Sequence, residues 1–272
     1  MSKASAPKGS AGRAYHIGLV RGEVAREILL VGDPARAERI AQRFSTVRVT
    51  QRCREYVTFT GTCAGAEVSV MATGMGPDNT EIALAELLPL VEQPVFLRVG
   101  TCGALQANLS CGTLVISTAS VRLETVTAAY VEPGHPALAH RDCVVALEAA
   151  AKRLGHAHAV GLSATAPGFY GAQGRAFGTV PPRDTALLQR LAAQGVLNME
   201  MESSALFTLA GLTGARSGAV CAVVGNRVTD EFLDESAKLA AEERAVDTAL
   251  SALQILRALD ARGGLSSVLP SA

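Results

Sequence analysis

The 272-residue sequence is poor in aromatic side chains, has no tryptophan and carries no formal net charge. Sites that stack single-stranded nucleic acid depend on aromatic residues, so this class of binding protein is disfavoured. A balanced charge also argues against a nucleic acid or a membrane surface as the partner. No apolar run is long enough to span a bilayer. These absences point towards a protein that acts on small molecules.

Paired cysteines, histidine clusters and a secretory signal are missing as well. None of the six cysteines forms a CxxC pair, so we predict no metal site. The N-terminus is polar and lacks the apolar stretch of a signal peptide, so we expect a cytoplasmic protein with reduced thiols. Residues 1–13 are predicted to form a disordered leader and residues 261–272 a loose tail, with one domain at 14–260.

Strand-like and helix-like segments alternate along this domain. Strands are predicted at 28–31, 56–63, 67–72, 95–99, 113–120, 159–164 and 219–224. Helices are predicted at 34–42, 80–88, 142–154, 185–193, 203–212 and 236–259. The alternation predicts a single α/β domain with a central mixed sheet and helices on both faces. Ligands in such folds bind at the carboxyl ends of strands, which predicts one shared neighbourhood for Gly32, Gly74, Gly100, Glu200 and Gly225.

Two of these strand ends combine glycine with arginine. Gly32 is followed by Arg36 on the first turn of a predicted helix, and Arg98 lies in an apolar strand that leads into Gly100 and Thr101. Glycine lets the backbone approach a ligand closely, a helix N-terminus attracts anions, and arginine binds phosphate oxygens bidentately. A phosphate site is one interpretation. The other is a buried Arg98 paired with a structural carboxylate.

Glu200 and Glu202 lie two residues apart where an apolar run leads into a predicted helix. In an extended segment alternate side chains face the same way, so both carboxylates can point into one pocket. Carboxylates only accept hydrogen bonds, which suits them to the paired hydroxyls of a sugar. Acidic residues are also favoured at the start of any helix, so a simple helix terminus is the alternative.

Seven segments, in this order, resemble the nucleoside phosphorylase-I family over nearly the whole chain, from about Tyr15 to the last helix. The two segments that point to its uridine branch are FYGAQGR and the NR that follows the last strand. The seven are GDPAR (32–36), ATGMGPDNTEIALAEL (72–87), FLRVGTCGAL (96–105), ISTASVRLE (116–124), FYGAQGR (169–175), NMEMESSALF (198–207) and VVGNR (223–227).

The resemblance implies a pentosyltransferase that reversibly converts uridine and phosphate to uracil and ribose 1-phosphate, without a cofactor. Deoxyuridine and thymidine are further candidate substrates. It also implies a homodimer as the minimum unit, which some members assemble into hexamers. The implied phosphate ligands are Gly32, Arg36, Arg98, Thr101 and, from a neighbouring subunit, Arg54. The implied ribose ligands are Glu200, Met201, Glu202 and, from the neighbour, His16. The implied base ligands are Phe169, Gln173, Arg175 and Arg227. Catalysis is assigned to Arg98, Glu202, Gln173 and Arg175.

Other functions remain open. A purine nucleoside phosphorylase of this family would carry an aspartic acid where this chain has Asn226, which cannot act as an acid. A nucleoside hydrolase would need no phosphate arginines, and a non-catalytic nucleoside-binding protein would be expected to lose them. Two positions depart from the family pattern. Cys102 replaces the usual Ser or Thr, either as a reactive thiol or as a small apolar filler. Gly225 replaces an aliphatic residue and predicts a roomier base pocket.

Overall fold

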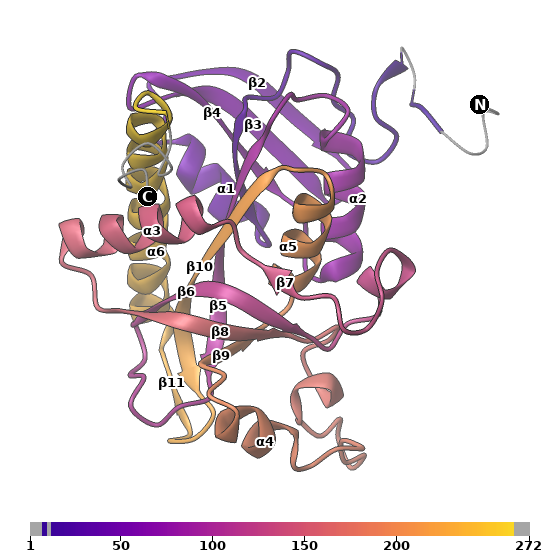
Figure 1. Cartoon of the computed structure of the whole chain (residues 1–272), viewed down its shortest axis with the longest axis vertical. Coiled ribbons are helices and arrows are strands. Elements are labelled where there is room, and N and C mark those ends of the chain that lie inside the picture. Colours follow the sequence, from indigo (N-terminus) through magenta and orange to yellow (C-terminus); the bar gives the residue numbers. More distant parts are fainter. Residues whose placement is uncertain (1–6, 10–11, 264–272) are drawn as a thin grey trace, which may run out of the picture.

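The computed structural model describes residues 7–9 and 12–263, and a mixed β-sheet forms its middle layer (Figure 1). It contains both parallel and antiparallel pairings, and the described residues contribute eleven strands. They are β1 (Glu27–Val31), β2 (Thr46–Cys53), β3 (Tyr56–Cys63), β4 (Ala66–Ala72), β5 (Val95–Ala104), β6 (Leu114–Arg122), β7 (Ala137–Leu138), β8 (His158–Thr165), β9 (Asn198–Glu200), β10 (Arg216–Asn226) and β11 (Glu231–Phe232).

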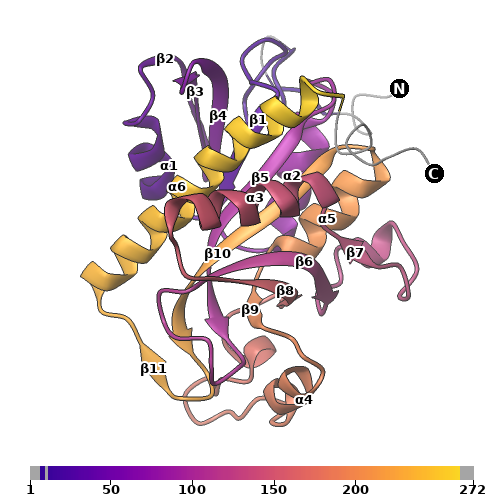
Figure 2. The same cartoon turned by 60° about the vertical axis from the view of Figure 1, so that its left-hand side comes forward.

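Helices cover both faces of this sheet, as predicted. One face packs against α1, α3 and α6, through side chains such as Ile40, Leu147 and Leu253 (Figure 2). The other packs against α2 and α5, through Leu84 and Leu206. The described α-helices are α1 (Pro34–Ala41), α2 (Pro77–Leu87), α3 (Arg141–Leu154), α4 (Leu187–Ala193), α5 (Ser203–Leu212) and α6 (Glu235–Asp260). None of the helices in the described ranges combines the length and the apolar character needed to cross a membrane.

Part of the sheet closes on itself around β5. One edge of β5 pairs with β10 over its whole length, and the chain of neighbours β10, β6, β8 and β9 returns to its other edge. On that second edge the pairing with β1 stops at Arg98, and the pairing with β9 begins only at Gly103. Among the described residues no strand pairs with the stretch between them on this side, and this opening is where the candidate site lies.

The predicted end of this strand at Val99 is wrong, because β5 continues to Ala104. Pairing with β10 persists through Gly100, so the glycine lies inside a strand rather than in a turn. A Cβ atom at Gly100 would lie 2.8 Å from Nη2 of Arg98 and 2.9 Å from Sγ of Cys221. The glycine therefore makes room for the Arg98 guanidinium beside the strand.

The other predicted elements are present within a few residues, and α1 begins as expected, with Asp33 Oδ1 accepting a hydrogen bond from the Ala35 amide. The strand β2 was not predicted, because its side chains are mostly exposed and show no apolar face. The predicted leader and tail lie largely outside the described residues. Of the leader, Arg13 contacts Glu23 and the carbonyl oxygen of Gly18.

Candidate active site

A cavity of about 990 Å³ lies against the open edge of β5. Its walls come from the residues that follow β1 and β4, from β5 itself, from β9 and from the end of β10. The five residues predicted to meet at the strand ends all line it, which confirms that neighbourhood: Gly32, Gly74, Gly100, Glu200 and Gly225.

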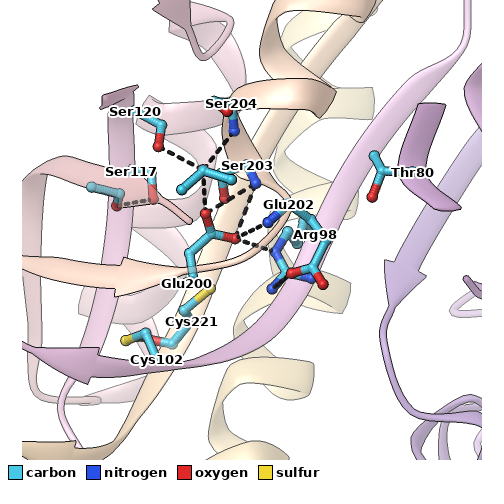
Figure 3. A network of polar contacts seen from close by, with 12 residues as sticks. Thr80, Arg98, Cys102, Ser117, Ser120, Glu200, Glu202, Ser203, Ser204 and Cys221 are labelled. Atoms are coloured by element: carbon cyan, nitrogen blue, oxygen red, sulfur yellow. Dashed lines mark hydrogen bonds and ion pairs between the residues drawn. The ribbon is translucent and has the colours of Figure 1, made fainter. Parts of the chain in front are cut away.

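Arg98 is held between two carboxylates in the wall of this cavity (Figure 3). Its Nε lies 2.8 Å from Glu200 Oε2, and its Nη2 forms an ion pair with Glu202. All three side chains are buried. Burial opposes the charge on Arg98, but Glu202 and Glu200 outweigh it and raise its pKa above the ordinary value. Arg98 is therefore paired with carboxylates, as the second interpretation of the sequence expected. The part of Arg98 in phosphate binding stays a prediction.

Both carboxylate oxygens of Glu200 accept hydrogen bonds from the protein itself. Its Oε1 accepts from the hydroxyl of Thr165 and from the Ser203 amide, at 3.1 Å for the amide. Its Oε2 accepts from Arg98 and, at 2.9 Å, from the Glu202 amide. A carboxylate has about four acceptor positions, so Glu200 has none to spare for a ligand. It fixes the start of α5 and thereby the position of Glu202.

Glu202 makes fewer contacts with the protein than Glu200 does. Its Oε1 accepts from the Gly76 amide at 2.6 Å, and its Oε2 binds Arg98. About half of its acceptor capacity is unused, and its side chain lines the cavity beside Met201. Burial raises the pKa of Glu202, Arg98 counteracts this, and the neighbouring Glu200 adds to the rise. The unused acceptor positions of Glu202 suit a pair of hydroxyl donors. The two carboxylates therefore have distinct tasks, because Glu200 binds the protein and Glu202 can bind a ligand.

Arg36 occupies a second wall and is also paired. Its Nη2 lies 2.7 Å from Glu242 Oε1, its Nε lies 3.3 Å from Glu242 Oε2, and its Nη1 donates to the Val99 carbonyl at 3.1 Å. Gly32 and Thr101, the other predicted phosphate ligands of this chain, line the same cavity. Within the described part of the chain the Thr101 hydroxyl has no side-chain hydrogen bond, so it is available to a ligand.

The base-binding candidates meet at a third wall. The guanidinium carbon of Arg175 lies 4.0 Å from the ring centroid of Phe169, and its Nη1 donates to Gln173 Oε1 at 2.8 Å. Arg227 donates to the backbone carbonyl of Gln173 at 3.1 Å. Neither arginine forms a salt bridge with a carboxylate of the described residues. Burial lowers the pKa of Arg227 below its ordinary value, and the nearby Asp230 counteracts this only in part. Burial, reinforced by Arg227, lowers the pKa of Arg175 to about 10.

Two predicted ligands do not reach this cavity. Arg54 lies in the turn between β2 and β3, with a left-handed φ of 54°, and its guanidinium stacks on Tyr15 at 5.2 Å. His16 Nδ1 lies 2.7 Å from Glu86 Oε1. Neither side chain lines the cavity of its own chain. This placement agrees with the expectation that both residues serve the site of a neighbouring subunit, which stays a prediction.

The departures from the family pattern have structural explanations. Cys102 is buried, and burial raises the pKa of its thiol well above the ordinary value, so it acts as a small filler and not as a nucleophile. The expectation of a roomier pocket at Gly225 is wrong as stated. A Cβ atom there would lie 2.7 Å from the ring of Phe232, so the aromatic ring takes the space of the missing side chain.

The cavity residues that were not predicted from the sequence include Phe232, Lys238 and Glu242. Glu242 left a signal, because it interrupts an apolar stripe of the last helix next to Ala241 and Ala245. Phe232 and Lys238 left none, since an exposed loop residue and a helix lysine are ordinary. No group of three or more His, Cys, Asp or Glu side chains in the described ranges could hold a metal ion.

The fold and this cavity define the class of protein. The chain belongs to the phosphorylase superfamily, whose family model matches residues 27–258. It is 39% identical to a uridine phosphorylase of Thermococcus kodakarensis over 259 residues, or 94% of this chain and 91% of that protein. It is 37% identical to a uridine phosphorylase of Treponema pallidum over 242 residues, covering 89% and 93% of the two chains. A solved nucleoside phosphorylase of Trypanosoma brucei, described as showing uridine phosphorylase activity, matches with a TM-score of 0.85 and 26% identity, covering 92% of this chain and 99% of that one.

Proposed function

We propose that this protein is a uridine phosphorylase, which reversibly converts uridine and inorganic phosphate to uracil and ribose 1-phosphate. The observation that carries the proposal is the order of charge along the cavity. Along β5, Arg36 binds the Val99 carbonyl, the net negative centre of Arg98, Glu200 and Glu202 lies beside Gly100, and Arg227 lies beside Gly103. Neither Arg227 nor its neighbour Arg175 forms a salt bridge with a carboxylate of the described residues. Named relatives at 37–39% identity act on uridine, which agrees with this order.

The reaction needs this order of charges. Breaking the glycosidic bond leaves the ribose cation-like at its anomeric carbon and the uracil anionic. Glu202 accepts hydrogen bonds from the ribose hydroxyls, so its negative charge lies beside the cation-like sugar. Arg175 and Gln173 donate to the uracil and stabilise the charge that develops there. Phosphate stabilises the sugar from the other side and then bonds to the anomeric carbon. Catalysis is therefore positioning and electrostatic stabilisation, without a protein nucleophile or a cofactor.

The remaining candidates support these contacts. Met201 lies beside Glu202 in the sugar wall, Phe169 offers an aromatic face to the base, and Arg227 holds the loop through Gln173. Gly32 and Thr101 flank the phosphate position. All six cysteines are free thiols, which agrees with the reducing cytoplasm as the place of action.

A homodimer is the proposed minimum unit, with Arg54 and His16 of a second copy completing each phosphate and ribose site. Mixing two inactive variants tests this. A heterodimer of Arg54→Ala and Glu202→Gln has one site with both changes and one site with neither, so mixing should restore activity. If the mixture stays as inactive as its components, Arg54 does not act across an interface.

Rival functions fit the cavity less well. Asn226 is buried, with its Nδ2 donating to the carbonyls of Gln106 and Leu109 and its Oδ1 accepting from Val228 and Thr229. It holds a turn, so it offers no acid for a purine. A hydrolase uses water and would need no phosphate site at Arg36 and Arg98.

One assay separates these functions. The protein is incubated with uridine, deoxyuridine, thymidine and inosine, each with and without phosphate and after dialysis against a chelator. We expect uracil release from uridine that requires phosphate and survives chelation. Release that ignores phosphate would indicate a hydrolase, and a preference for inosine would contradict the base assignment.

A further inference from the structure

The phosphate wall of this chain carries too little positive charge for a dianion. Its two arginines, Arg36 and Arg98, face three carboxylates that bind them directly, Glu242, Glu200 and Glu202. Asp33, which also lines the cavity, adds another negative charge. Like charges repel phosphate, so binding needs cations beyond these two, and the proposed Arg54 of a neighbouring subunit is only one of them. This inference rests on the proposed function, because it concerns the phosphate substrate.

Lys238 is a lysine in this wall that lacks a carboxylate of its own. Its Nζ lies 4.0 Å from Glu242 Oε1, an oxygen that Arg36 Nη2 already binds at 2.7 Å. The other oxygen of Glu242 is bound by Arg39, also at 2.7 Å. The Lys238 ammonium group has no hydrogen-bond partner among the residues that the structure describes, and its side chain is 46% exposed while lining the cavity.

The stability of α6 does not explain this lysine. Lys238 lies in the first turns of the helix, where the helix dipole disfavours a cation. Its order with Glu242, lysine before glutamate at a spacing of four, is also the less favourable one. A residue that breaks two local rules and gains only a 4.0 Å contact with Glu242 points to a functional role.

We propose that Lys238 is a phosphate-binding residue of this enzyme. Its ammonium group donates to a phosphate oxygen beside Arg36, and the flexible four-carbon side chain lets it move away from Glu242 to do so. With it, the phosphate wall has three cations in one chain: Arg36, Arg98 and Lys238. The ligand it binds is the co-substrate itself, in the same cavity as the nucleoside.

Steady-state kinetics test the proposal. Uracil release is measured for the wild type, Lys238→Met and Lys238→Arg, varying phosphate at saturating uridine and uridine at saturating phosphate. Losing one charge-assisted hydrogen bond should raise the phosphate KM of Lys238→Met about tenfold, with the uridine KM unchanged. Lys238→Arg keeps the charge and should stay within about twofold of the wild type. The phosphate KM of the wild type should also rise more steeply with salt than that of Lys238→Met.

Lys152→Met is the matched control, because this lysine of α3 is exposed, pairs with Glu148 and does not line the cavity. Its kinetics should equal those of the wild type. An unchanged phosphate KM in Lys238→Met, beside an active wild type, overturns the role of Lys238 alone. Equal defects in Lys238→Met and Lys238→Arg overturn the charge argument. A wild type that releases no uracil with phosphate refutes the proposed function instead.

Discussion

The centre of the cavity and its base end hold their arginines in opposite ways. At the centre, Arg98 is buried and paired with two carboxylates, and Glu200 has no unused acceptor. At the base end, Arg175 and Arg227 donate to neutral oxygens and lose part of their affinity for protons to burial. In the first region the arginine is already paired before any ligand arrives. In the second, neither arginine forms a salt bridge with a carboxylate of the described residues, and uracil supplies an anion in the transition state of the proposed reaction.

The sharpest test of this contrast is the stability of Arg98→Ala. The substitution leaves Glu200 and Glu202 buried side by side without a cation, and the free energy of unfolding should fall by about 4 kcal/mol. Arg175→Ala should change it by only about 0.5 kcal/mol, because no buried carboxylate loses its partner. Urea unfolding measures both. Equal midpoints for the two variants would contradict the difference between the regions.

A second test separates the two carboxylates. Glu202→Gln should lower kcat/KM for uridine about a hundredfold, since it weakens hydrogen bonds to two hydroxyls. The stability of the Glu202→Gln variant should not fall below that of the wild type. The folded state raises the pKa of Glu202, so the folded protein holds this proton more tightly than the unfolded chain does. The stability from that proton is present at low pH and is lost as the pH rises through the folded pKa.

Ionising Glu202 in the folded protein therefore costs stability, and the neutral glutamine should keep or raise the thermal midpoint. Glu200→Gln is the matched comparison. It removes an acceptor of the Arg98, Thr165 and α5 contacts, so it should lower the midpoint. If Glu202→Gln melts below Glu200→Gln, the division of tasks between them is wrong.

Arg175→Ala tests the base end. It should reduce kcat/KM about thirtyfold, mostly through kcat, because the charge it stabilises develops in the transition state. Initial rates over a range of uridine concentrations give both constants. A pure rise in KM would mean that Arg175 only binds the ground state.

Phe169→Ala should have the smallest effect. Losing one aromatic face against the base should raise the uridine KM about fivefold. Phe177→Ala is the control, because Phe177 is an exposed aromatic residue of the same loop region that does not line the cavity. Equal effects of the two substitutions would point to the loop as a whole instead of this ring.

Local patterns predicted much of this site. The start of α1 at Asp33, the neighbourhood of the strand ends and the proximity of Glu200 and Glu202 all follow from short-range rules. The partners of the arginines did not follow. Glu242 is more than two hundred residues from Arg36, and no spacing rule connects them. The end of β5 was missed for a related reason, since pairing with β10 and not local propensity carries the strand through Gly100.

The start of α5 has a consequence for how substrates are oriented. A helix terminus normally offers its free amides to an incoming anion. Here Glu200 accepts from the Glu202 and Ser203 amides, and the Thr165 hydroxyl accepts from the Ser204 amide. The Glu200 carboxylate thus occupies this helix terminus, so these amides are not available to phosphate. An arrangement with phosphate at this helix terminus is therefore disfavoured, which agrees with the proposed phosphate position on the Arg36 side.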